Sequence, residues 1–327
     1  MINPNDITVD VEEQREWLLA YKQTINPKTG NPWSWSELER ASGISSGTIS
    51  LFAGAKYGGK DENVALRIFK FRQLLQSQAE RGAGIPDEPG FLLTPTAMRL
   101  RSLLVMAQRG RITMGCTGPG TSKTFVIQDY KETVANVWVA TMQPVTHKLR
   151  PMVKAVLMAI GNSAVGNSSW MSDQVQMLVA KKNGVIVIDE ANHLDLECLE
   201  QLRAWHDATG VGIALFGNEE LWAMIRGGKR HHAFARLNSR ISMSHLQDLP
   251  LREDLEMYLD AWGIEDAGMR KLLVDTGLTP GAGGLREVRQ IIENASMLAV
   301  DDHQPLSLGH LREAQSTRAT RAMRVAI

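Results

Sequence analysis

The stretch that decides the fold is Arg111-Ile-Thr-Met-Gly-Cys-Thr-Gly-Pro-Gly-Thr-Ser-Lys-Thr-Phe125. A short apolar run leads into a Gly-rich turn, and Lys123 and Thr124 close the turn before a helix-like segment. This is the layout of a phosphate-binding loop, in which backbone N–H groups and a helix N-terminus face the anion. The lysine reaches the outer phosphates and the threonine hydroxyl ligates Mg²⁺. The expected binding residues are Gly118, Pro119, Gly120, Thr121, Ser122, Lys123, Thr124 and Phe125.

Two positions of this loop depart from the usual pattern. Aligned on Lys123, Thr117 replaces the first glycine and Ser122 replaces the glycine before the lysine. Position 122 normally lies against the phosphates, so a Cβ there is expected to crowd them. Taken alone, the loop leaves open a simple Gly/Pro turn that carries a lysine.

Composition limits the functions that are open to the chain. Its 327 residues are long enough for two domains, and 36 Lys and Arg balance 36 Asp and Glu. A nucleic-acid surface must therefore be a local patch. The two cysteines cannot form a disulfide framework, and no signal peptide or apolar run of membrane-spanning length is present. A reducing cytoplasm with no membrane association is the expectation.

The N-terminal part carries a helix-turn-helix pattern. A polar start contains an expected helix at 12–21, and the pattern itself covers 36–52. Its apolar anchors and turn glycine are Leu38, Gly43, Ile44, Ile49 and Phe52.

The second helix of this pattern, Ser45 to Ala53, is expected to expose Ser45, Ser46, Thr48 and Ser50 but no Arg, Asn or Gln. It should therefore position the protein on DNA more than read bases. Lys56, Tyr57 and Lys60 suit phosphate contacts. A helical protein-interaction module with the same packing is the alternative.

The pattern also divides the chain into parts. A helix over 62–80 closes a helix-turn-helix domain at 1–80, and residues 81–90 have linker composition. Strands and helices alternate over 91–248, whereas 249–327 loses strand periodicity and is expected to be a helical lid.

Polar side chains follow the apolar strands of the α/β part. Strands are expected at 137–141, 184–190, 211–218 and 241–245, and they imply a parallel sheet with its site at the carboxyl ends. Lys123, Asp189, Glu190 and Asn218 lie at such ends. We expect Asp189 to support Mg²⁺ through water, Glu190 to polarise the attacking water, and Asn218 to orient that water or the γ-phosphate.

Several arginines are candidates for stabilising transition-state charge. Arg286 could lean onto the γ-phosphate, while Arg236 or Arg240 could reach the nucleotide of a neighbouring subunit. Ordinary surface ion pairs are the alternative for each. A final helix carrying Arg312, Arg318, Arg321 and Arg324 is expected to form a small basic patch, and the His231–His232 pair lacks the spacing of a metal site.

With Ile188-Asp-Glu-Ala-Asn-His-Leu194, Asn218 and Gly284-Leu-Arg286 in view, residues 91–320 resemble the AAA+ superfamily. Together with Gly54-Ala-Lys-Tyr-Gly-Gly59 after the helix-turn-helix, nearly the whole chain is similar to the phage Mu B target-selection protein family. The resemblance implies ATP and Mg²⁺ as ligands, double-stranded DNA bound with little sequence preference, and an ATP-dependent helical filament or ring. It also implies delivery of DNA to a DDE transposase whose contact stimulates weak hydrolysis, in a bacterial host cytoplasm.

The resemblance further suggests that DNA lies along the segment after the second strand. There Lys148, Arg150 and Lys154 are the candidates, although a solvated helix face would look the same. Two other functions stay open: a helicase loader of the same superfamily, and a non-hydrolysing regulator that binds an operator.

Overall fold

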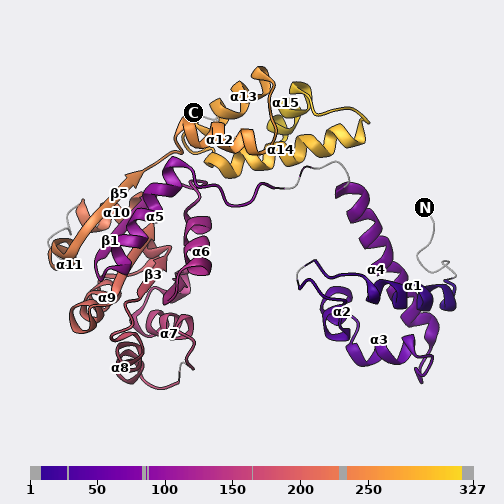
Figure 1. Ribbon diagram of the computed structural model, residues 1–327, viewed down its shortest axis with the longest axis horizontal. Helices are drawn as coiled ribbons and strands as arrows, with labels where there is room; N and C mark the ends of the chain where they lie inside the picture. Colours follow the sequence, from indigo (N-terminus) through magenta and orange to yellow (C-terminus); the bar gives the residue numbers. More distant parts are fainter. Residues whose placement is uncertain are drawn as a thin grey trace. The chain divides into compact units, whose positions relative to one another are not determined.

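The computed structural model describes residues 9–27, 29–82, 86, 88–163, 165–227 and 234–318. The chain forms two compact units, Met1–Ile85 and Pro86–Ile327, whose helices and strands are labelled in Figure 1. Helix α4 (Asp61–Gly82) extends two residues into the stretch expected to be a linker. The pair His231–His232 lies outside the described residues.

The N-terminal unit is all-helical. Helices α1 (Val11–Gln23), α2 (Trp35–Ser42) and α3 (Ser46–Ala53) pack with α4 around a core that includes Leu38, Ile49 and Phe52. A capping box between Ser34 and Glu37 starts α2, and Gly43 ends it at φ 70°. The expected helix-turn-helix packing is therefore present.

The second unit is built on a parallel sheet of five strands in the order β2-β3-β4-β1-β5. The strands are β1 (Ile112–Thr117), β2 (Val137–Thr141), β3 (Val185–Asp189), β4 (Gly212–Gly217) and β5 (Ile241–Gln247). Strands β1, β3 and β4 are fully buried, as their continuous apolar runs predict. Because the strands are parallel, Thr117, Asp189 and Gly217 end at the same edge.

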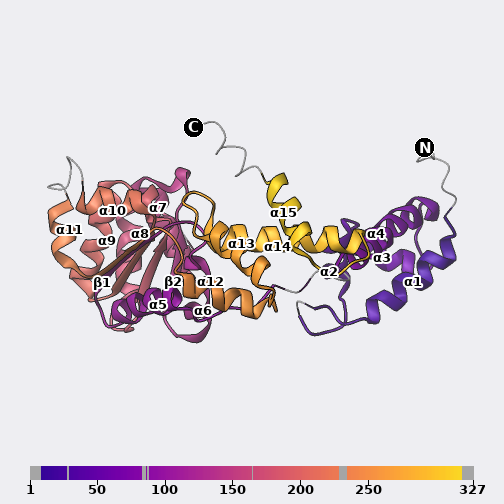
Figure 2. The same ribbon diagram turned by 90° about the horizontal axis from the view of Figure 1, so that it is seen from above.

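Helices cover both faces of this sheet (Figure 2). On one face, α5 (Pro95–Gln108) and α6 (Lys123–Thr133) pack Leu100 and Ile127 against Phe216 of the sheet. The other face is covered by α7 (Leu149–Ala159), α8 (Ser168–Val179), α9 (Leu196–Thr209), α10 (Glu219–Arg226) and α11 (Ala235–Arg240), together with the short 3-10 helices η1 (Pro144–Thr146) and η2 (Ala191–His193). This is the expected α/β fold with a parallel sheet.

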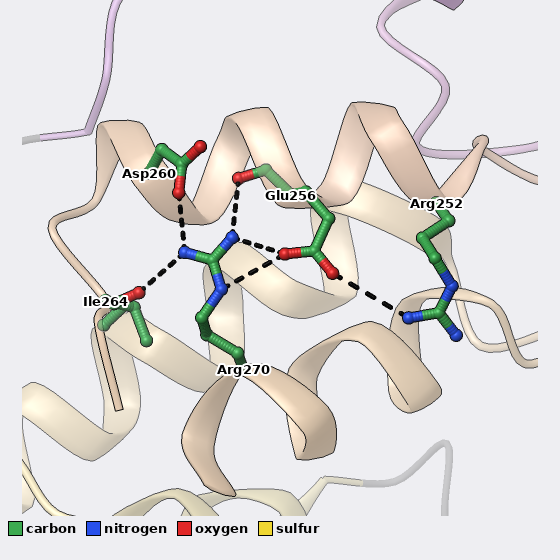
Figure 3. Close-up of polar contacts among 5 residues, drawn as sticks. All are labelled: Arg252, Glu256, Asp260, Ile264 and Arg270. Atoms are coloured by element: carbon green, nitrogen blue, oxygen red, sulfur yellow. Dashed lines mark hydrogen bonds and ion pairs between the residues drawn. The ribbon is translucent and has the colours of Figure 1, made fainter. Parts of the chain in front are cut away.

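The helical lid consists of α12 (Arg252–Ala261), α13 (Ala267–Gly277), α14 (Gly284–Asp301) and α15 (Leu308–Thr317), which share one apolar core. Figure 3 shows the polar contacts that join the first two. The Arg270 guanidinium donates to Glu256 and Asp260 of α12 and, at 2.9 Å, to the Ile264 carbonyl. Arg252 approaches the other oxygen of Glu256. These contacts hold α12 and α13 together.

A buried carboxylate joins the lid to the sheet. Asp254 of α12 is 1% exposed and accepts from the Thr96 N–H at 2.9 Å, from the Thr96 hydroxyl, and from the Leu251 N–H at 2.7 Å. The Gln247 amide at the end of β5 donates to the same hydroxyl at 2.7 Å. Since Thr96 lies in the first turn of α5, one carboxylate fixes the lid at the edge of the sheet that carries the loop.

The C-terminal prediction was partly wrong. Helix α15 ends at Thr317, and the Arg318 guanidinium donates to both carboxylate oxygens of buried Glu287, at 3.1 and 2.7 Å. Arg318 is therefore a structural partner of α14 and is not part of a free basic patch. Arg312 is exposed, and Arg321 and Arg324 lie outside the described residues. Among the helices of the described residues, none combines the length and apolarity that crossing a membrane requires.

Candidate nucleotide-binding site

The loop between β1 and α6 presents unpaired backbone donors. Within the described chain, none of the N–H groups from Gly120 to Phe125 donates to a protein acceptor, and the first helical bond is Val126 N–H to Ser122 O at 3.0 Å. Gly118 N–H, in contrast, is held by the Gln247 carbonyl at 3.0 Å. A run of free N–H groups at a helix N-terminus is a binding site for an anion such as phosphate.

The two unusual loop residues have different roles. Thr117 is buried, and its hydroxyl lies 2.6 Å from that of Thr121, which donates to the Gly118 carbonyl at 2.8 Å. Thr117 therefore braces the loop from inside. Ser122 adopts the left-handed conformation, at φ 66°, that the usual glycine adopts without strain. For an L-residue this conformation costs on the order of 1–2 kcal/mol.

Lys123 bridges two strand ends. Its ammonium donates to the carbonyls of Thr117 and Gly217, both at 2.8 Å. Burial lowers the pKa of Lys123, and the charges of Glu190 and Asp189 oppose that shift. The positive charge is thus fixed at the carboxyl edge of the sheet.

The acidic pair follows β3. Asp189 is buried, and burial followed by the Glu190 charge raises the pKa of its carboxyl. Its Oδ1 accepts from the Glu190 N–H at 3.0 Å. The prediction that strand 184–190 includes Glu190 was wrong: the strand stops at Asp189, and Glu190 turns left-handed at φ 54°. Because of this turn, the two side chains differ in burial: Asp189 is buried and Glu190 is half-buried.

A cavity of about 380 Å³ brings most of the predicted residues together. One wall consists of residues 117–125, and Glu190, Asn218 and Arg286 also line the cavity. Asn218 caps α10 through its Oδ1, which accepts from Glu220 N–H at 3.0 Å. A volume in this range suits a small-molecule ligand, and the free loop donors and Lys123 fit its phosphates.

The rest of the cavity lining was not predicted from the sequence. It is formed by Glu88, Pro89, Gly90, Phe91, Leu92, Thr94, Tyr258, Leu285 and Arg289. The Arg289 guanidinium donates to both Glu88 oxygens, at 2.9 and 3.0 Å. The available signal was that Arg289 follows Arg286 by three residues on one helix, which places both on nearly the same face.

The lid touches the loop directly. Leu285 N–H in the first turn of α14 donates to the Gly120 carbonyl at 3.0 Å. Gly120 has φ +70°, and a Cβ there would lie 1.9 Å from the Gly283 carbonyl oxygen. Only a glycine permits this close approach, which places Arg286 on the cavity.

Some predicted residues lie elsewhere. Asp189 is buried and does not line the cavity, and neither Arg236 nor Arg240 lines it. Both arginines are exposed, and Arg240 Nε lies 3.3 Å from Asp207 Oδ1. Within this chain, the structure therefore does not bring these two arginines to the loop.

The three cations after β2 differ in their surroundings. Lys148 pairs with Asp195 at 3.2 Å, and Arg150 donates to the Gly166 carbonyl at 3.4 Å. Lys154 is exposed, and no carboxylate of the described residues lies within ion-pair distance of it. Lys154 is consequently the most available of the three.

In the N-terminal unit, the expectation of an exposed row along α3 was only partly right. Ser45 is exposed, but its hydroxyl caps the helix and donates to Thr48 at 2.8 Å. Ser46, Thr48 and Ser50 are half-buried, because α2 packs closely here: Glu39 accepts from the Ser46 N–H at 3.0 Å.

Of the three residues after α3 that were expected to contact phosphates, two are accessible. Lys56 and Lys60 are exposed, whereas Tyr57 is half-buried against the core. The lysines remain free for phosphate contacts, and the tyrosine mainly packs.

The parallel sheet, the loop between β1 and α6, the acidic pair after β3 and the helical lid define an AAA+ protein. Comparison with known families agrees: the AAA domain model matches residues 107–225, and the model of the Mu B transposition protein, C terminal, matches residues 239–317. The chain is therefore similar to Mu B transposition proteins, in agreement with the resemblance seen in its motifs.

Two relatives show the extent of the similarity. The ATP-dependent target DNA activator B of Escherichia phage Mu is 29% identical over 86% of this chain and 89% of its own length. The Mu-like prophage FluMu DNA transposition protein B of Haemophilus influenzae is 27% identical over 78% of this chain and 88% of its own. Among solved structures, the RuvB Holliday junction branch migration motor of Thermotoga maritima matches 68% of this chain and 67% of its own, with a TM-score of 0.42 and 14% identity.

Proposed function

We propose that this protein is an ATP-dependent, sequence-tolerant DNA-binding protein that activates target DNA for transposition. The single observation that carries the nucleotide part is the run of free N–H groups from Gly120 to Phe125 beside Lys123, in a cavity that Arg286 also lines. The transposition part rests on the relatives, one of which is named an ATP-dependent target DNA activator.

ATP would supply a cleavable γ-phosphate, and Mg²⁺ would neutralise the charge that develops on it. Thr124, exposed in the first turn of α6, and the buried Asp189 are the residues that would hold Mg²⁺. Lys123 would exchange its carbonyl partners for phosphate oxygens. Glu190 would orient and polarise the attacking water, with Asn218 and Arg286 completing the site.

We further propose that nucleotide controls assembly. Copies of the chain would form a helical filament or ring on double-stranded DNA and deliver it to a DDE transposase. Arg240 or Arg236, both exposed away from the cavity of their own chain, would complete the site of a neighbouring copy. Hydrolysis would be weak, stimulated by DNA and transposase, and would release the assembly. The DNA contacts would come from residues 1–80 and from the cations after β2, in a host cytoplasm.

The nucleotide site is tested by calorimetry with ATP and Mg²⁺. The unaltered protein should take up ATP, Lys123→Ala should not, and Glu190→Gln should bind ATP but hydrolyse it slowly. Electron microscopy of the protein with ATP and duplex DNA should then show continuous assemblies. No ATP uptake by the unaltered protein would refute the proposal, and a monomer in sedimentation with ATP and DNA would refute assembly.

Two other functions predict different results. A helicase loader would bind a replicative helicase in place of a transposase. A nucleotide-sensing regulator would protect one discrete site in footprinting, whereas an assembly on target DNA would protect the DNA continuously. The absence of Arg, Asn and Gln from α3 favours continuous protection, because these side chains make the specific contacts to bases.

A further inference from the structure

The connection between β2 and β3 contains two helices, α7 and α8, and Gly166, just before α8, lies beside the first turn of α7. This connection is described except for residue 164. The guanidinium of Arg150, in the first turn of α7, donates to the Gly166 carbonyl at 3.4 Å. As a result, the start of α8 lies beside the start of α7.

Trp170 stands in the first turn of α8 and is 46% exposed. Its ring lies on the backbone of Gly166, because a Cβ added there would be 2.9 Å from the ring. The next residue, Met171, enters the core instead. Among the described residues, the Trp170 indole N–H has no protein acceptor. A large ring that is held in position and yet left exposed is typical of a binding surface.

The charge around this ring identifies the occupant. Residues 147–177 contain three cations, Lys148, Arg150 and Lys154, and one acid, Asp173, in a chain whose total charge is zero. Lys148 is paired with Asp195, so Arg150 and Lys154 supply the positive charge that no carboxylate of the described residues opposes. Arg150 touches the same glycine as the Trp170 ring, and Lys154 follows one helical turn later on α7. A positive surface with an exposed aromatic ring is complementary to nucleic acid: cations meet phosphates, and the ring meets sugars and base edges.

We propose that Trp170 contacts DNA, with its ring in a groove of the duplex while Arg150 and Lys154 bind flanking phosphates. This inference rests on the proposed DNA-binding function and adds a contact that does not depend on charge. Such a contact is tolerant of sequence, because every base pair presents sugar and apolar edges. It would fix how deeply the helix pair enters the groove.

The test compares four variants of the full-length protein on a mixed-sequence duplex with ATP, by fluorescence anisotropy at a series of salt concentrations. Trp170→Ala should weaken DNA binding about tenfold, the loss expected when a partly exposed apolar ring is no longer buried, without changing the salt dependence. Lys154→Ala should weaken binding and lower the slope of log K against log salt by about 0.9. Trp170→Phe, which keeps a ring, should retain most of the affinity. The matched control is Met177→Ala, which removes a more exposed apolar side chain, at 62%, from the same helix.

The outcomes separate this inference from the proposed function. If the unaltered protein binds DNA and Trp170→Ala binds it equally well, the inference is wrong and the proposed function stands. If Trp170→Ala abolishes self-association without DNA, the ring is a protein contact and the inference is also wrong. If the unaltered protein binds no DNA, both fail. Circular dichroism and ATP uptake of each variant show whether the fold and the nucleotide site are retained.

Discussion

Replacing Asp254 by asparagine should loosen the lid strongly although it changes one atom. In the wild type, Oδ1 accepts from Thr96 N–H, and Oδ2 accepts from the Thr96 hydroxyl and from Leu251 N–H. An asparagine keeps one carboxamide oxygen as an acceptor. Its NH₂ group replaces Oδ2 and faces the Thr96 hydroxyl and the Leu251 N–H. The hydroxyl can rotate, but the Leu251 N–H cannot. One buried donor is then left unpaired and a charge-assisted bond is lost, at a cost of about 2–3 kcal/mol.

For a unit of this size, 1 kcal/mol corresponds to about 2–4 °C, so the Tm of Asp254→Asn should fall by about 4 to 12 °C in calorimetry. The matched control is Asp260→Asn on the same helix, whose 67% exposed side chain pairs with Arg270. Exposed pairs contribute about 0–1 kcal/mol, so this variant should change little. Equal losses in the two variants would refute the reasoning that the buried network fixes the lid. ATP affinity should fall with Asp254→Asn only.

Three further outcomes are expected. Gly120→Ala should lose more stability and ATP affinity than Gly281→Ala, because both glycines have φ near +70° but only the first would meet the Gly283 oxygen; equal effects in calorimetry would contradict the close lid contact. Asp189→Asn should raise the stability of the protein without nucleotide by about 1 kcal/mol at neutral pH, because burial raises the pKa of this carboxyl and penalises its charged form. Because the carboxyl becomes neutral as pH falls through the raised pKa, the difference in stability between Asp189→Asn and the unaltered protein should shrink toward about pH 3.9. Urea unfolding at several pH values checks this. Ser122→Gly should remove left-handed strain and the Cβ near the loop, so stopped-flow measurements should show faster ATP binding; slower binding would mean that the serine hydroxyl contributes a ligand contact.

Local sequence pattern predicted much of the second unit. The strands β1, β3 and β4 are continuous apolar runs, and the loop before Lys123 is rich in glycine. Both features could therefore be predicted from the local sequence alone. Parallel topology then placed Lys123 and Glu190 at one edge. The loss of strand periodicity after residue 248 predicted the helical lid, in which Arg286 was already a candidate.

Contacts between distant residues could not be predicted in this way. Glu88 meets Arg289 across 201 positions of the chain, and Thr96 meets Asp254 across 158. Neither pair leaves a local periodic signal, because each partner is an ordinary polar residue in its own helix or loop. Arg318 was misjudged for the same reason: its charge is visible in the sequence, whereas its buried partner Glu287 is not.

The wall formed by residues 88–92 has a practical consequence for dissecting this protein. A shortened ATPase fragment that begins at Phe91 would discard the Glu88 carboxylate, leave Arg289 without that partner and open one side of the cavity. Beginning at residue 107, where the AAA family model starts to match, would also delete most of α5, including the Leu100 and Leu104 side chains that fill one face of the sheet. A fragment that begins at Pro86 keeps both features, so its nucleotide affinity can be compared fairly with that of the entire chain.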